Sequence, residues 1–243
     1  MKGVEKALET EFPRHTMRIC AQHLYSNFKE KYGGPVYHNL FWRAANTTSV
    51  HIFNKAMEEI RKKSRQAAEY LLGVPQQWSK HHFEREVVCD HNTSNFVESF
   101  NALINELREK PVLQLMEGIR TDFMQKHSER REVAEKLGRH DLTPYAQSIL
   151  DSNASDIRFC VVINAGHGEL EVSEGTQPFP VDLTKHTCLC GYWQVTGIPC
   201  KYACRAIYYL KGDPKRYVHA FYSADNYRNT YLDYIHPMPN EDA

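Results

Sequence analysis

The sequence lacks three features that would narrow its function at once. It has no net charge, because thirty Lys and Arg balance thirty Asp and Glu; nucleic acid binding would therefore need a local basic patch. It has no long hydrophobic run, since FCVVI (159–163) is far shorter than the roughly 20 residues that span a bilayer. Its first residues, MKGVEKALETEF, carry charges throughout and lack the apolar stretch of a secretory signal. We therefore expect neither membrane insertion nor export.

The chain also lacks an even set of cysteines. Of the seven, four lie between positions 188 and 204, whereas Cys20, Cys89 and Cys160 are single. An odd number with one dense group argues against a disulfide framework and for reduced thiols inside a cell. The 42% hydrophobic and 25% charged residues are typical of an ordinary globular protein.

Apolar periodicity predicts a helix-rich first half. Helices are expected over residues 2–12, 20–33, 35–46, 49–73, 94–107 and 111–136, and short strands over 16–20 and 83–89. In the last two helices the apolar stripes are expected to face inward; they comprise Phe96, Val97, Phe100, Leu103, Ile104, Leu107, Leu115, Met116, Ile119, Phe123 and Met124. We place a helical region at 1–140, an irregular linker at 141–156 and a small domain at 157–243.

The small domain reads as a β-β-α arrangement. IRFCVVI (157–163), GELEVS (168–173) and FPVDL (179–183) have the composition of strands separated by Gly- and Pro-containing turns, and YACRAIYYL (202–210) that of a helix. The tyrosine-rich end lacks periodicity and is expected to wrap this domain. The predicted fold class is α+β.

The cysteine group has the spacing of a metal site. Structural zinc takes four ligands, commonly as two close pairs; Cys188 and Cys190 form one pair across a tight turn, and Cys200 begins the next helix. The residues alone leave two interpretations open, a zinc site and a core packed with small thiols.

The motif VDLTKHTCLCGYWQVTGIPCKYACRAI (181–207) resembles the SWIM zinc finger, whose pattern is C-x-C, a spacer and C-x-H, and is most similar to the version in plant Mutator-like transposases and their domesticated relatives. This resemblance implies Zn²⁺ as cofactor and Cys188, Cys190 and Cys200 as ligands. Tyr202 stands at the family's histidine position. Two candidates for the fourth ligand are Cys204, one helical turn from Cys200, and His186, which forms H-x-C-x-C with the first pair.

The helical half also resembles Mutator-like transposases, which carry a DDE triad in an RNase H-like domain. NTSNFVESFNALINELREKPVLQLMEGIR (92–120) is similar to the segment that holds the triad glutamate, here Glu98. RICAQHLYSNF (18–28) resembles the family's C-x-x-H element, and KGVEKALETEFP (2–13) the segment after the second aspartate. A DDE enzyme needs three carboxylates for two metals. We therefore expect Glu98 to be a relic, in a truncated and catalytically inactive domain whose surviving strand, near 17–20, is an unpaired edge.

The expected function is zinc-dependent binding of DNA or of a nuclear protein through the finger, in the nucleus, with no small-molecule substrate. A basic group around the finger is the expected DNA contact; it comprises Lys185, Lys201, Arg205, Lys211, Lys215 and Arg216. The alternatives are an active DDE transposase, if a longer chain supplies the aspartates, a protein-interaction module that docks through the tyrosine-rich tail and finger, and a transposon relic with a degenerate finger.

Overall fold

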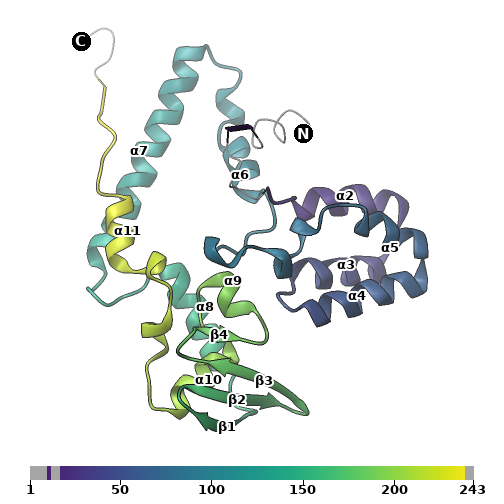
Figure 1. Cartoon of the computed structure of the whole chain (residues 1–243). Coiled ribbons are helices and arrows are strands. Elements are labelled where there is room, and N and C mark those ends of the chain that lie inside the picture. The colour runs from purple at the N-terminus through teal and green to yellow at the C-terminus, as the bar shows by residue number, and fades with distance from the viewer. Residues whose placement is uncertain (1–9, 12–16, 239–243) are drawn as a thin grey trace.

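The computed structural model describes residues 10–11 and 17–238, which form a mixed α+β fold (Figure 1). Within these residues lie ten α-helices and one four-stranded antiparallel sheet. A helical bundle, an arm of two helices and the sheet with its helices form three parts of the molecule (Figure 1). The helix expected over 2–12 lies almost entirely outside the described residues. None of the helices in the described part is long and apolar enough to span a membrane.

The bundle contains α2 (Ala21–Lys31), α3 (Pro35–Asn46), α4 (Val50–Lys63) and α5 (Arg65–Leu72), and it has its own core. Phe28, Phe41 and Trp78 are fully buried there, and the rings of Phe41 and Trp78 stack with centroids 5.2 Å apart. Trp78 belongs to the 3₁₀ helix η1 (Gln76–Trp78), which η2 (Lys80–His82) follows. The predicted helices of this part are confirmed, except that 49–73 is two helices, because Ser64 adopts an extended backbone and caps α5.

Two predicted strands are wrong. Residues 17–20 form no strand: Ile19 N donates to Gln77 O in η1, and the next residue, Ala21 at the start of α2, donates its N–H to Asn92 O. Residues 83–89 contain the 3₁₀ helix η3 (Arg85–Val87), after which Val88 takes a left-handed conformation. Neither segment has a neighbouring strand to pair with, so the β-branched residues alone do not make a strand.

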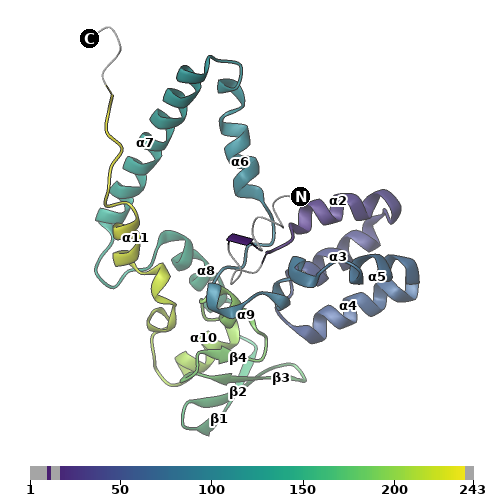
Figure 2. The same cartoon turned by 45° about the horizontal axis from the view of Figure 1, so that its top comes forward.

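The arm consists of α6 (Asn95–Leu103), the 3₁₀ helix η4 (Asn105–Leu107) and the long α7 (Val112–Lys136), which diverge from each other (Figure 2). Both helices occur as predicted, but their apolar stripes are not core. Phe96 is 73% and Met116 62% exposed, and between residues 95 and 136 only Ala134 is buried. Periodicity reports amphipathic character, and the described elements that contact the arm, α11 among them, leave its apolar face exposed or half-buried.

The segment 141–156, expected as an irregular linker, contains α8 (Pro144–Ser155). Thr143 accepts a capping hydrogen bond from Ala146 N, and Pro144 occupies the first turn. Ala146 and Leu150 of α8 pack with Ile198 and Cys204 in a small core of their own.

The sheet has the order β1-β2-β3-β4. The three predicted strands are confirmed as β1 (Cys160–Gly166), β2 (Glu169–Glu174) and β3 (Gln177–Asp182), to which a short β4 (Thr187–Cys188) is added. The helix α9 (Tyr192–Thr196) follows, and then the predicted helix, observed as α10 (Lys201–Tyr209), which packs on the sheet. The chain continues through η5 (Pro214–Tyr217) and η6 (Ala220–Tyr222).

The C-terminal part departs from the expectation that it wraps the small domain. It forms α11 (Ala224–Thr230), which lies beside α7 (Figure 1). Arg131 of α7 donates to the carbonyl oxygen of Tyr231 at 2.9 Å, and Arg130 to the Tyr231 hydroxyl at 3.0 Å. The long helix therefore has the tail as its partner rather than a second core helix.

Candidate metal centre

Three short elements bring Cys188, Cys190 and Cys200 together. Cys188 ends β4 and pairs with Val181 of β3. A tight turn then carries Cys190, with Gly191 N donating to Cys188 O at 2.9 Å. Cys200 is the N-cap of α10, where its sulfur accepts from Ala203 N. The three Sγ atoms lie within 4.8 Å of one another. This is the one such group of His, Cys, Asp or Glu donors in the described part of the chain.

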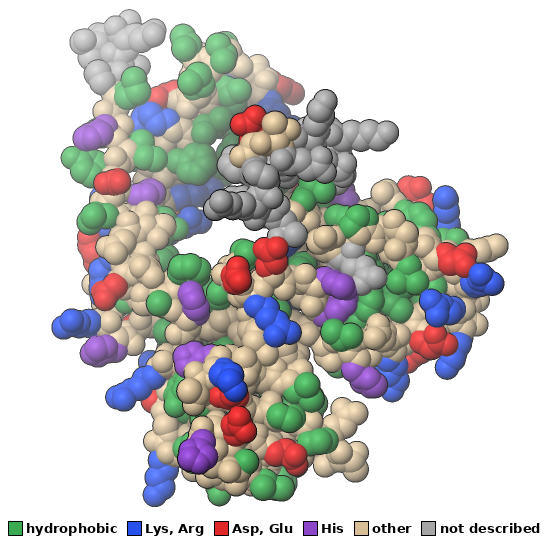
Figure 3. Space-filling view, in the orientation of Figure 1, with side chains coloured by type: hydrophobic (Ala, Val, Ile, Leu, Met, Phe, Trp, Pro, Cys, Tyr) green, Lys and Arg blue, Asp and Glu red, His purple; other side chains and the backbone are tan. Residues whose placement is uncertain are grey.

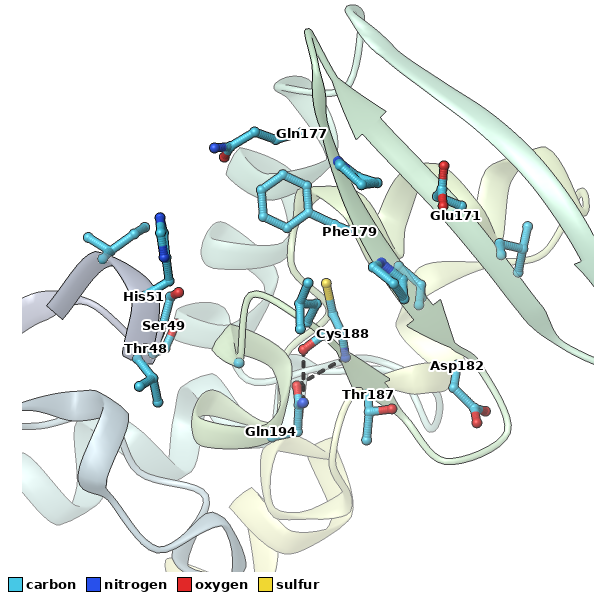
Figure 4. A pocket seen from close by; sticks show the side chains of 18 of the residues that line it. Thr48, Ser49, His51, Glu171, Gln177, Phe179, Asp182, Thr187, Cys188 and Gln194 are labelled. Atoms are coloured by element: carbon cyan, nitrogen blue, oxygen red, sulfur yellow. Dashed lines mark hydrogen bonds between the residues drawn. The ribbon is translucent and has the colours of Figure 1, made fainter. Parts of the chain in front are cut away.

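The Gln194 side chain fixes the position of Cys188. Its Oε1 accepts from Cys188 N at 3.2 Å and its Nε2 donates to Cys188 O at 2.9 Å, so both backbone groups of this cysteine are bound by one amide (Figure 4). The sequence pattern did not single out Gln194; its place in α9, six residues after the cysteine, becomes meaningful only once the turn is known.

Hydrogen bonds among the three thiols shift their pKa values in opposite directions. Hydrogen bonds from Cys188 and Cys200 lower the pKa of Cys190 to about 4. Donation to Cys190 raises the pKa of Cys188, and burial is the main cause that raises the pKa of Cys200. Cys190 is therefore the first to become a thiolate, the form that ligates metals. Three clustered sulfurs, two of them buried, fit the soft donor set of zinc.

The structure does not bring Cys204 to this group. Its thiol donates to Pro199 O at 3.6 Å, and its side chain is fully buried with Leu150 of α8 and Ile198. The helical spacing from Cys200 misled the prediction, because Cys200 is a cap residue with an extended backbone (φ −71°, ψ 170°) and its sulfur points back at the helix N-terminus. The two sulfurs thus face different cores on either side of α10.

His186 and Tyr202 are also occupied elsewhere. The exposed His186 stacks its ring on Trp193, with centroids 5.1 Å apart. Tyr202, at the family's histidine position, stacks on Phe179 at 3.9 Å and donates its hydroxyl to Glu174 at 3.1 Å. Burial and the Glu174 carboxylate raise the pKa of Tyr202, which keeps the phenol protonated. A protonated phenol is a poor zinc ligand.

Two close contacts join the finger to the helical half. The Thr48 hydroxyl, just before α4, donates to Cys190 O at 2.7 Å. Gly191 has φ +76°, and a Cβ built there would lie 2.5 Å from Thr48 O. Gly197 has φ +71°, and a Cβ there would lie 2.2 Å from Val88. Both sites therefore need glycine, and sequence reasoning did not single out Thr48 or Val88.

A cavity of about 1250 Å³ separates the start of α4 from the sheet beside the thiols (Figure 4). His51 and Ser49 lie on its helical side, and Phe179, Cys188 and Gln194 on its sheet side (Figure 4). Cys188 thus belongs to the core of the sheet and also lines this cavity.

Three residues of the basic group around the finger have a polar partner among the described residues. Lys185 pairs with Asp182 at 2.7 Å, Lys201 with Glu174 at 2.8 Å, and Arg205 donates to Cys160 O at 3.0 Å. Lys211 and Arg216 are exposed and Lys215 is half-buried. On the face in Figure 3, blue and red side chains are interspersed rather than gathered in one field.

The residues that resemble transposase motifs lie at the start of α2 and from α6 into α7, and the segment 2–13 lies almost entirely outside the described residues. Glu98 is exposed in the first turn of α6 and joins no group of metal-ligating side chains among the described residues. Cys20 and His23 meet Ser94, whose backbone N and hydroxyl each lie 3.3 Å from the Cys20 sulfur.

Comparison with known proteins identifies a SWIM zinc finger domain at residues 159–211. The matched segment includes all three clustered cysteines, all four strands of the sheet and α10. No curated protein and no solved structure matches the chain. The finger, with its three thiols as a potential metal site, is thus the part of the molecule whose family is established.

Proposed function

We propose that Cys188, Cys190 and Cys200 hold one Zn²⁺ and that the finger is a structural, non-catalytic binding module. The observation that carries this proposal is the convergence of three thiols from β4, the following turn and the start of α10. Bound zinc would join β4, the following turn and the start of α10 through its three sulfur ligands. Part of the free energy of zinc binding therefore contributes to the free energy of folding.

The test is the zinc content of the purified full chain, measured by mass spectrometry. One zinc per chain is expected in the parent and in Cys160→Ser, a matched control in which a buried thiol outside the group is removed. Cys188→Ser and Cys200→Ser are expected to lose the zinc. Absence of zinc in the parent overturns the proposal, and its appearance only in Tyr202→His supports the alternative of a degenerate finger.

We propose further that the chain derives from a Mutator-like transposase and is catalytically inactive. Support comes from the motif at 92–120 and from the isolation of Glu98. Since one carboxylate cannot hold two metals, a magnesium-dependent cleavage and strand-transfer assay is expected to give no product. Activity that Glu98→Gln abolishes would support the alternative of an active DDE enzyme.

The proposed partner is DNA in the nucleus, contacted by three basic residues near the end of α10 that form no ion pair with any described residue, Lys211, Lys215 and Arg216. Each phosphate contact adds roughly 0.9 to the slope of log affinity against log salt. We expect a triple alanine variant to lower that slope, measured by fluorescence anisotropy, whereas Lys185→Ala, at a lysine already paired with Asp182, leaves it nearly unchanged. If DNA does not bind while a nuclear protein is retained, the partner is a protein.

A further inference from the structure

The candidate metal centre has three sulfurs, and no residue that the structure describes places a fourth ligand with them. Zinc in a site with three protein ligands keeps an open position for water or another molecule, whereas a structural site closes it. The fate of this fourth position therefore decides whether the finger is only a structural unit or also a place where something binds.

Each nearby candidate of this chain is held by another contact. Cys204 faces the α8 core, and His186 lies flat against Trp193. Tyr202 is held at both ends, by Phe179 against its ring and Glu174 at its hydroxyl. Moving any of these to the thiols would cost a buried contact, a ring stack or a hydrogen bond.

The cavity between α4 and the sheet supplies a path to the centre. Cys188 lines it, and its volume of about 1250 Å³ is far larger than the roughly 30 Å³ that a water molecule takes up in the liquid. Of the three thiol residues, only Cys188, which is 2% exposed, belongs to the cavity lining. A small molecule or a side chain in the cavity therefore reaches the centre at Cys188.

The net charge of the zinc site differs between the classes of donor that could fill the fourth position. Three thiolates around one Zn²⁺ leave a net charge of −1, and a fourth thiolate would make it −2 in a largely buried place. Burying unpaired charge is costly. The nearest described lysine in sequence, Lys201, is already paired with Glu174 and Asp156. A neutral donor, either water or an imidazole nitrogen, adds no further negative charge to this place.

We infer that the centre is an open three-thiolate site whose fourth position holds exchangeable water and accepts an external imidazole through this cavity. The inference rests on the proposed zinc binding and deepens it. The imidazole can come from a free small molecule or from a histidine side chain of a peptide, and the experiment separates the two sources.

The test uses the full chain loaded with Co²⁺, which reports its ligands through visible absorption. Imidazole is expected to shift the visible bands saturably in the parent. The same response is expected in Cys204→Ala, His186→Ala, His51→Ala and Tyr202→Phe, because none of these side chains ligates the metal. In Tyr202→His the response is expected to be lost, since the new imidazole fills the position. A histidine-containing peptide and its alanine counterpart form the second arm.

The outcomes separate the inference from the proposed function. Cobalt bound by the parent without any imidazole response overturns the inference and leaves metal binding intact. The same holds if the response appears only after removal of Cys204, His186, His51 or the Tyr202 hydroxyl, because that group then fills the position. If Tyr202→His does not fold, these four variants still decide the question. No bound metal overturns both claims. A response to the peptide alone identifies a protein histidine as the donor; a response to free imidazole alone identifies a small molecule.

Discussion

At the residue scale, the turn after Cys190 depends on the absence of a side chain at Gly191. We expect Gly191→Ala to lower the free energy of unfolding by about 3 kcal/mol, because it adds a collision with Thr48 O to the cost of a left-handed backbone. The control is Gly175→Ala, at φ +61° with nothing within 4 Å of the added Cβ. It should cost about 1–2 kcal/mol, the cost of the left-handed backbone alone. Equal losses in urea denaturation would show that the Thr48 contact does not matter.

His81 gives the helical half a dependence on pH. It lies between the Phe53 ring and Ser79, whose hydroxyl donates to Ala44 O and therefore accepts from His81 Nδ1. Burial, with a smaller effect of His82, lowers the pKa of His81 from 6.5 to about 4. The unfolded chain therefore binds an additional proton between these values, and stability present above pH 6.5 is lost as the pH falls toward 4.

We expect His81→Asn to flatten this loss, because its amide can still donate to Ser79 but does not titrate. The measurement is the free energy of unfolding from urea titrations at several pH values between 4 and 7. His51→Asn, at an exposed histidine, is the control and should keep the parental slope. A parental slope in His81→Asn would place the titrating group elsewhere.

The residues of the metal centre were predictable where the signal is local. The spacing of Cys188, Cys190 and Cys200 indicated a metal site, and the structure groups these three thiols. Cys204, one of two candidates for the fourth ligand, lies away from the group because helical spacing presumes that both residues have helical backbones, and Cys200 does not. Tyr202 could be recognised as a departure from the pattern, but its partners Glu174 and Phe179 come from different strands, and their pairing depends on the sheet register.

At the scale of elements, the break between α4 and α5 shows how one residue overrides a continuous pattern. Residues 49–73 read as one helix because the apolar positions continue across Ser64. That serine leaves the helix with φ −155°, and its hydroxyl accepts from Ala67 N at 3.2 Å. Serine is favoured at such caps because it satisfies a free backbone N–H.

We expect Ser64→Ala to lower the free energy of unfolding by about 1 kcal/mol, as losses of N-caps do. Ser49 precedes α4 at the equivalent position but makes no side-chain cap hydrogen bond. Ser49→Ala should therefore cost clearly less in the same urea titration. A larger loss from Ser49→Ala than from Ser64→Ala would contradict the assignment of the cap.

The elements predicted correctly are those whose partners are close in sequence. The helices of the bundle and the strands at 160–182 pair with their sequence neighbours, so periodicity and turns suffice. The strands expected at 17–20 and 83–89 needed distant partners that the described chain does not place there. The arm has a helical pattern whose apolar residues stay exposed or half-buried, and periodicity cannot tell a core stripe from an exposed one.

At the scale of the molecule, two buried cores lie in separate parts of the chain. The bundle core surrounds Trp78, and the finger core surrounds Trp193. The contacts between them described above are few, chiefly Thr48 with the turn at Cys190 and Gly191, and Val88 with Gly197. Loss of metal should therefore loosen the finger while most of the bundle stays folded, since each core is stabilised by its own burial.

We expect metal chelation under reducing conditions to accelerate amide hydrogen exchange by more than about tenfold, equivalent to roughly 1.4 kcal/mol, in residues 180–210. The helices α2 and α5 should be unchanged, and the start of α4 should respond because Thr48 binds Cys190 O. Cys188→Ser with zinc present is the matched control and should show the pattern of the chelated parent. Acceleration throughout α2–α5 would mean that the two cores unfold as one unit; no acceleration near the cysteines would mean that the metal does not stabilise the finger.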